Sequence, residues 1–352
     1  MENILTLPFI KRFSSDIAID LGSENSRISS DTSTAKYSES SLVAYDKTKS
    51  RTIAVGDQAK KMLGRTPPNI KIIPPIKNGA VGNLERGCEI IELLLKRLKN
   101  KSMIKPRFMA AMPEDSNELE RRSVFEALRL SGSRITYLIQ DIIAAAVGSD
   151  IPVMEANGGI IADLGSTSSR IAIISLGGIV EIKKTNSAGE SMTKDIISAL
   201  LKRHGLVIGD LTAEKIKKQL GSAVKPDQNE SIKVRGRGAN SGLPEEAAFT
   251  SEEAYEALYD SLSKITETIR SCIESSPHGL ITDVIEKGIV ICGGIAHMRG
   301  LDRMISSRLN IKCRIAPEPS FAVLNGMKKI MASPQLMKFF FENSNDRIGE
   351  TV

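Results

Sequence analysis

Apolar residues fall into short runs typical of buried strands and into longer stretches with helical spacing. Strand-like runs lie at residues 17–19, 160–162 and 288–291, and the last is followed by the glycine pair at 293–294. Apolar positions at helical spacing predict amphipathic helices, which we place at residues 84–99, 118–131, 195–204 and 212–220. Strands that alternate with helices predict an α/β protein with sheets covered by helices.

One nine-residue segment occurs twice, half a chain apart. Residues 20–28 read Asp-Leu-Gly-Ser-Glu-Asn-Ser-Arg-Ile, and residues 163–171 read Asp-Leu-Gly-Ser-Thr-Ser-Ser-Arg-Ile. Each copy follows a strand-like run, so each is predicted to form a β-hairpin with Gly and small polar residues in its turn. The duplication predicts two related lobes.

Turns of this composition can bind phosphate. Glycine allows backbone conformations closed to other residues, and consecutive amides in a tight turn form an anion site. The preceding aspartate, Asp20 or Asp163, could hold Mg²⁺ through water. A single turn of this kind is more often a plain tight turn. The near-identical second copy favours two hairpins that clasp one polyphosphate.

Length and composition narrow the classes of function. A chain of 352 residues is too long for one compact core, which predicts a bilobed protein. Aromatic residues make up only 4% and Trp is absent, so few side chains could stack on the bases of a single-stranded nucleic acid. No nucleic-acid partner is therefore expected. The net charge of +6 favours a weak attraction to anionic surfaces.

The cysteines and the ends of the chain point to a cytosolic protein. The four cysteines and three histidines are scattered without metal-ligand spacing. No apolar run approaches the roughly 18 residues needed to span a bilayer. The amino terminus lacks the basic region and cleavage site of a secretion signal. We therefore expect a reduced, cytoplasmic setting.

Five segments, in order along residues 16–330, resemble the MreB family of bacterial actins. They are residues 20–26, 55–67, 137–146, 163–180 and 289–301. The run Ser175 to Val180, and Arg235-Gly236-Arg237 before Gly242-Leu243-Pro244, are more similar to MreB than to chaperones, sugar kinases or the division protein FtsA.

The resemblance implies an actin-like ATPase fold. Two duplicated, ribonuclease-H-like lobes, each with an inserted subdomain, would surround a nucleotide cleft. The implied boundaries are 1–30, 76–148 and 323–352 for the core of lobe I, 31–75 for its insert, 149–186 and 250–322 for the core of lobe II, and 187–249 for its insert.

The same resemblance implies ATP and Mg²⁺ as ligands and assigns residues to them. Asp20 and Asp163 would position hydrated Mg²⁺. Residues from both turns and from three other segments would bind the nucleotide: Gly22, Ser23, Glu24, Asn25, Ser26, Gly165, Ser166, Thr167, Ser168, Glu190, Glu214, Lys217, Gly293, Gly294, Ile295, Ala296 and His297. Taken without the resemblance, Glu214 and Lys217 are more simply a solvated helix pair.

Departures from the family gather at residues assigned to the cleft. The family's catalytic Ile-Glu-Glu-Pro segment is Ile-Gln-Asp-Ile at residues 139–142, which leaves Asp141 as the catalytic carboxylate, one methylene shorter. Asp141 could instead merely cap the Ala-rich helix that follows. Ser166, Thr167 and Ile295 stand where the family has glycine. We therefore expect reduced nucleotide affinity and slow or absent hydrolysis.

MreB proteins lie on the inner face of the cytoplasmic membrane, and two segments here could make that contact. The amino-terminal stretch carries Phe9 and Ile10 beside a basic pair, and residues 99–107 place Met103 and Ile104 among basic residues. Apolar insertion and headgroup attraction would act together. The second segment, where Met103 and Ile104 are expected to be exposed, is the stronger candidate; the first could instead be a disordered tail or an edge strand.

The resulting function is a membrane-associated, nucleotide-dependent filament that polymerises with itself, scaffolds cell-wall synthesis and maintains cell shape, with elongation-complex proteins as partners. The alternative is a catalytically weak scaffold that copolymerises with or regulates another filament. A small-molecule kinase of the same superfold is a weaker option, because no acidic motif outside the two turns supplies a substrate base.

Overall fold

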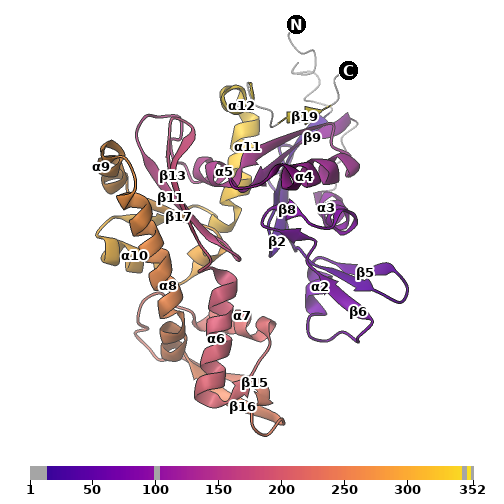
Figure 1. Cartoon of the computed structure of the whole chain (residues 1–352), viewed down its shortest axis with the longest axis vertical. Coiled ribbons are helices and arrows are strands. Elements are labelled where there is room, and N and C mark those ends of the chain that lie inside the picture. Colours follow the sequence, from indigo (N-terminus) through magenta and orange to yellow (C-terminus); the bar gives the residue numbers. More distant parts are fainter. Residues whose placement is uncertain (1–13, 99–103, 343–346, 350–352) are drawn as a thin grey trace. The chain divides into compact units, whose positions relative to one another are not determined.

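A computed structural model describes residues 14–98, 104–342 and 347–349 of the chain. The chain forms two compact units, the first from residues 1–151 with 321–352 and the second from residues 152–320. The first unit thus combines the amino-terminal part of the chain, indigo and purple in Figure 1, with the carboxyl-terminal helices, drawn in yellow.

The first unit is built on a six-stranded sheet with the order β19-β10-β9-β1-β2-β3. The strands are β1 (Ser14–Leu21), β2 (Asn25–Ser30), β3 (Lys36–Ser40), β9 (Ile104–Met112), β10 (Ile135–Gln140) and β19 (Arg347–Gly349). β1 is antiparallel to β2 and parallel to β9, and β9 is parallel to β10. β1 therefore lies inside the sheet, which explains its uninterrupted apolar run.

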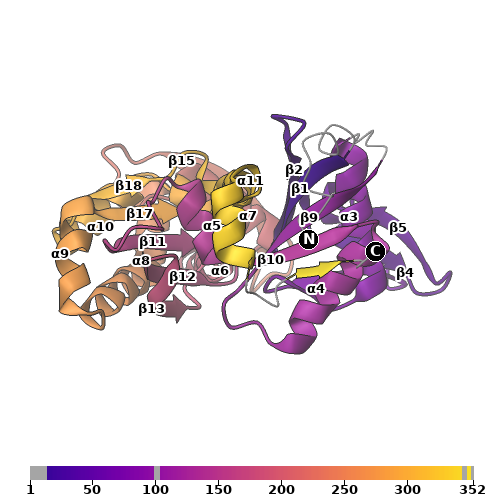
Figure 2. The ribbon, with the colours of Figure 1, turned by 90° about the horizontal axis from the view of Figure 1, so that it is seen from above.

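Helices cover both faces of this sheet. α3 and α4 pack on one face and α5 and α11 on the other (Figure 2). The helices of this unit are α2 (Asp57–Lys61), α3 (Leu84–Leu98), α4 (Glu118–Leu130), α5 (Asp141–Gly148), α11 (Ala322–Ala332) and α12 (Pro334–Phe341). Buried apolar residues of β1, β9, α3 and α4 make up one continuous core.

Two small sheets complete the first unit. One has the order β5-β4-β6 and the other pairs β7 with β8. Their strands are β4 (Val43–Asp46), β5 (Arg51–Val55), β6 (Ile70–Ile73), β7 (Ile76–Lys77) and β8 (Ala80–Val81). β3 belongs to the six-stranded sheet, although it lies within the segment 31–75 that the sequence assigns to an insert.

The second unit repeats the pattern of the first with a five-stranded sheet, β13-β12-β11-β17-β18. Its strands are β11 (Gly159–Leu164), β12 (Ser169–Ser175), β13 (Gly178–Thr185), β17 (Ile289–Cys292) and β18 (Cys313–Ile315). β11 is antiparallel to β12 and parallel to β17, just as β1 is to β2 and β9. The two predicted hairpins and the duplicated topology are confirmed.

The other elements of the second unit include a three-stranded sheet, β14-β15-β16, at one end of the long helix α6 (Figure 1). They are α6 (Gly189–His204), β14 (Leu206–Val207), α7 (Asp210–Leu220), β15 (Ser231–Gly238), β16 (Pro244–Thr250), α8 (Ser251–Glu274), α9 (His278–Lys287), the 3-10 helix η2 (Gly294–His297) and α10 (Leu301–Leu309); the 3-10 helix η3 (Pro319–Phe321) joins the units. One buried apolar cluster runs through this unit.

The four helices that apolar spacing predicts all exist, with small differences at their ends. α6 begins six residues before the predicted start at 195, because residues 189–194 hold no apolar stripe except Met192. The division into four subdomains stays a prediction. None of the helices in the described ranges combines the length and apolar character needed to cross a membrane.

Helices α5 and α11 of the first unit cross unusually closely, and two glycines make this possible. A Cβ at Gly326 would collide with the carbonyl oxygen of Ala144, and one at Gly148 would collide with that of Ala322. Both obstacles are backbone atoms, which cannot rotate away. The packing of α5, whose first residue is Asp141, therefore depends on glycine at positions 148 and 326.

We expect Gly326→Ala to destabilise the first unit by at least about 1–3 kcal/mol, the usual cost of overpacking a core. Thermal unfolding should show a midpoint lowered by several degrees. Gly279→Ala in α9 is the matched control, because the added Cβ would meet no atom within 4 Å. Equal midpoints for wild type and Gly326→Ala would contradict the close crossing.

Candidate functional site

Each repeated segment forms a hairpin with an aspartate–arginine ion pair across its strands. Asp20 lies opposite Arg27 in the β1–β2 ladder, and Asp163 lies opposite Arg170 in the β11–β12 ladder. The Arg27 Nη1 to Asp20 Oδ2 distance is 3.0 Å, and the Arg170 Nη2 to Asp163 Oδ2 distance is 3.1 Å. All four side chains are mostly buried. Each carboxylate is therefore fixed at the end of its strand, immediately before the turn.

The glycine two residues after each aspartate is required by the turn itself. A Cβ at Gly22 would lie 2.6 Å from the Asn25 carbonyl oxygen, and one at Gly165 would lie 2.9 Å from that of Ser168. In the second turn the Gly165 amide donates to the Ser168 carbonyl at 3.1 Å. The remaining turn residues are partly exposed in both copies. This cradle, with small polar side chains and a carboxylate beside it, suits a phosphate with a hydrated Mg²⁺.

The first turn is tied to neighbouring parts of the first unit. The Ser23 hydroxyl accepts a hydrogen bond from the Asn78 amide at 2.9 Å, which leaves its proton available for donation to a phosphate oxygen. Glu24 forms an ion pair with Lys60 of α2. Ser26 is buried and bonds the Ser41 hydroxyl at 2.8 Å, so it supports the turn from within rather than facing a ligand.

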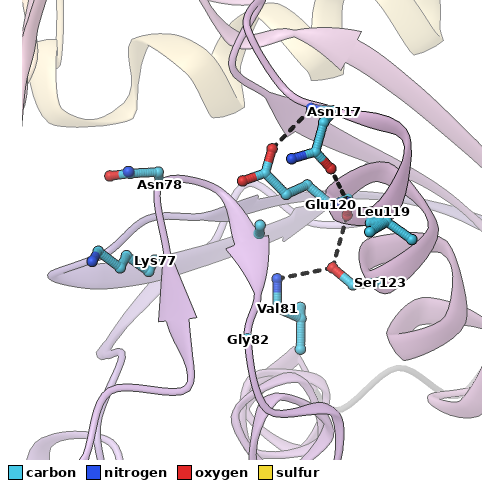
Figure 3. Close-up of a pocket in the computed structure, with 9 residues that line it drawn as sticks. Lys77, Asn78, Val81, Gly82, Asn117, Leu119, Glu120 and Ser123 are labelled. Carbon is cyan, nitrogen blue, oxygen red and sulfur yellow. Dashed lines mark hydrogen bonds between the residues drawn. The ribbon is translucent and has the colours of Figure 1, made fainter.

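Asn78 also borders a pocket of about 480 Å³ in the first unit (Figure 3). The β7–β8 hairpin forms one wall and the start of α4 forms the other. Ser123 joins the walls, because its hydroxyl accepts from the Val81 amide at 3.2 Å. The Asn117–Glu120 capping box closes the α4 side. Asn78 therefore contributes to this pocket and to the first turn at once.

The second turn is docked on the beginning of α6. The Gly189 amide donates to the Gly165 carbonyl at 3.1 Å, and the Glu190 amide donates to that of Ser166 at 2.8 Å. The Glu190 side chain is exposed. These bonds use the first amides of the helix, which lack partners inside it. The positive end of the helix dipole consequently lies next to the turn.

Glu214 and Lys217 of α7 belong to the same network. The Lys217 ammonium lies 2.6 Å from a Glu214 carboxylate oxygen and is largely buried. Burial favours a raised pKa for Glu214, but hydrogen bonds and positive charge from Lys217 and Lys218 outweigh it and lower the pKa to about 2. The interpretation as a solvated surface pair is therefore wrong, and Glu214 is ionised at neutral pH.

The glycine pair after β17 is held against the end of β11. Gly293 has a φ of 87° and its Cβ position would collide with the Leu164 backbone, so both conformation and space require glycine. Gly294 begins η2 and Ala296 is buried within it. Ile295 is buried in the apolar core of the second unit, so only its backbone could face a ligand. The exposed His297 bonds the Ser320 hydroxyl at 2.9 Å.

Asp141 is the first residue of α5 and is buried. The N-cap of that helix is Gln140, which forms no side-chain capping bond, so the interpretation of Asp141 as a cap is wrong. Among the membrane candidates, Phe9, Ile10 and Met103 lie outside the described residues. Ile104 is the first residue of β9 and is half-buried, so the expectation of an exposed loop residue is wrong for it.

Comparison with known proteins places this geometry in a family. The sequence model of the MreB/Mbl protein family matches residues 14–338. The chain belongs to the MreB/Mbl family. It is 34% identical to the cell shape-determining protein MreB of Escherichia coli K12 over 325 residues, which cover 91% of this chain and 94% of the relative. It is 33% identical to Mbl of Bacillus subtilis 168, with 89% and 95% covered.

A solved structure of the family agrees with the fold. The crystal structure of MreB5 of Spiroplasma citri bound to ADP superposes with a TM-score of 0.87 at 30% identity, covering 94% of this chain and 99% of that one. The predicted actin-like fold is confirmed. The roles of the individual site residues stay predictions.

Sequence reasoning missed three residues of this MreB/Mbl site. Arg27 and Arg170 stand at the same place in both repeats, and the hairpin register alone would have set each opposite its aspartate. No comparable pattern in the sequence identifies Thr193. It lies on α6 one turn after Gly189, and its contact with Lys217 depends on how α6 packs against α7.

Proposed function

We propose that this chain binds an adenine nucleotide with Mg²⁺ at its two repeated turns. The observation that carries the proposal is the second turn, where a glycine cradle, a fixed carboxylate and a helix amino terminus meet. A family relative has been solved with ADP, which supports the same ligand here. Asp20 and Asp163 would hold the metal through water, and the two turns would bind phosphate oxygens.

We propose further that the protein is a self-polymerising bacterial actin that maintains cell shape. The relatives at 33–34% identity are named cell shape-determining proteins, and they match over most of their length. In this proposal the filament lies on the inner face of the cytoplasmic membrane and positions cell-wall synthesis proteins. Nucleotide bound at the turns would favour the conformation that polymerises.

Hydrolysis is proposed to be slow. Asp141 is one methylene shorter than the glutamate that the family resemblance implies, and a misplacement of about 1 Å can cost on the order of a hundredfold in rate. The β-branched Thr167 also suits a glycine turn poorly. Phosphate release in the presence of assembled protein separates a slow ATPase from an inactive scaffold, because only the first releases more phosphate than a protein-free blank.

Asp163→Asn should weaken Mg-ATP binding by about tenfold, which corresponds to roughly 1.4 kcal/mol. Asparagine can still bond Arg170 but lacks the charge that attracts hydrated Mg²⁺, so ATP binding in EDTA should change little. Titration of a fluorescent ATP analogue measures both. Asp302→Asn in α10 is the control. Unchanged Mg-ATP affinity in folded Asp163→Asn and Asp20→Asn would refute the assignment.

The membrane proposal concerns Met103 and Ile104, and Ile104 is half-buried in β9. Met103→Ser should reduce co-sedimentation with anionic vesicles, because burying such a side chain contributes roughly 1.5–3 kcal/mol. Ile104→Ser should have a smaller effect. Vesicle binding that survives Met103→Ser and disappears on deletion of residues 1–13 would move the anchor to the segment with Phe9 and Ile10.

A further inference from the structure

The two repeated turns differ in charge. The nine-residue segments are identical except at two positions, and at one of these Glu24 of the first turn stands where the second turn has Thr167. Glu24 follows Ser23, whose hydroxyl is available to a phosphate oxygen. A carboxylate this close to a phosphate repels it, because both groups are negatively charged. Phosphate binding at the first turn therefore depends on where this carboxylate lies.

The Glu24 carboxylate is held by Lys60 of α2. The Lys60 ammonium forms an ion pair with Glu24 Oε1. The Glu24 side chain is 41% exposed and that of Lys60 is 25% exposed, so water and salt screen the pair only in part. A cation at contact distance offsets the charge of the carboxylate and keeps it directed towards α2.

The helix that carries Lys60 is itself fixed beside the first turn. The Asp57 carboxylate at the start of α2 accepts hydrogen bonds from the Ser40 amide at 3.1 Å and from the Ser40 hydroxyl at 2.6 Å. Ser40 lies opposite Asn25, the residue after Glu24, in the β2–β3 ladder. The position of Lys60 relative to the turn is therefore set by other bonds as well as by the ion pair.

We propose that Lys60 is a positioning residue for nucleotide binding, which holds the Glu24 carboxylate on the α2 side of the first turn and so keeps a negative charge away from the bound phosphates. Glu24 then sets the phosphate affinity of this turn, and the uncharged Thr167 has no such effect in the second. This inference rests on the proposed function. Because the repulsion grows with the charge of the ligand, Lys60 matters more for Mg-ATP than for Mg-ADP.

The test measures the affinities for Mg-ATP and Mg-ADP by competition with a fluorescent ATP analogue. Lys60→Met releases the Glu24 carboxylate and should weaken Mg-ATP by about tenfold and Mg-ADP by about threefold, since Mg-ATP carries roughly twice the net negative charge. Both losses should shrink at high salt, which screens charges and would not repair a packing defect. Lys60→Arg keeps the cation and should bind both nucleotides nearly as wild type does.

Lys61→Met is the matched control. Lys61 is the next residue of α2 and is exposed, so this variant loses the same charge from the same helix. It should bind both nucleotides as wild type does. Glu24→Gln removes the negative charge at nearly constant size and should bind Mg-ATP at least as tightly as wild type. Adding Lys60→Met to Glu24→Gln should then cause no further loss.

Equal effects of Lys60→Met and Lys61→Met would overturn the proposal. A loss that is as large in the Glu24→Gln background as in wild type would also overturn it, because Lys60 would then act on the phosphates directly. Thermal unfolding checks that each variant is folded, and its midpoint should change little, since a partly exposed ion pair contributes little to stability. A wild-type protein that binds neither nucleotide would instead refute the proposed function itself.

Discussion

The ion pair across each hairpin is the constraint on which each candidate phosphate turn depends. In each unit a mostly buried aspartate at the end of the central strand faces an arginine on the next strand, seven residues later. Removing one partner of a buried pair typically costs about 3–5 kcal/mol, so truncation of either side chain should destabilise its unit. The pair fixes a carboxylate beside a glycine turn, and the turn then keeps its shape through backbone bonds.

The second unit extends this constraint from the turn to two helices. The turn carbonyls accept from the first amides of α6, and the largely buried Lys217 and Thr193, with half-buried Glu214, hold α6 against α7. In the first unit Asn78 and Lys60 contact the side chains of Ser23 and Glu24 in the corresponding turn. Ser41 holds its backbone, because the Ser41 hydroxyl donates to the Gly22 carbonyl at 2.6 Å and the Ser41 amide donates to the Glu24 carbonyl at 3.0 Å. The same sequence motif is thus supported by different surroundings in the two units.

Much of the fold could be predicted from the sequence, because apolar spacing and the repeated segment are local signals. The repeat predicted both hairpins, and helical spacing predicted α3, α4 and α7. The surroundings of individual side chains were harder to predict than the elements. Glu214 and Lys217 resemble any exposed pair three residues apart, and only the packing of α7 on α6 buries them. Ile104 looked like a loop residue because its pairing in β9 depends on β1, ninety residues earlier. Asp141 looked like a cap because helix boundaries shift by one residue without changing the pattern.

The central claim of the proposed function is that both repeated turns take part in nucleotide binding. Hydrogen exchange followed by mass spectrometry, with and without Mg-ATP, reports on each turn separately. Our account predicts that the amides of residues 22–26 and 165–169 are both protected when nucleotide binds, while the β15–β16 hairpin at residues 231–250 stays unchanged. Protection of only one turn, or of neither, in protein that has bound Mg-ATP would contradict it.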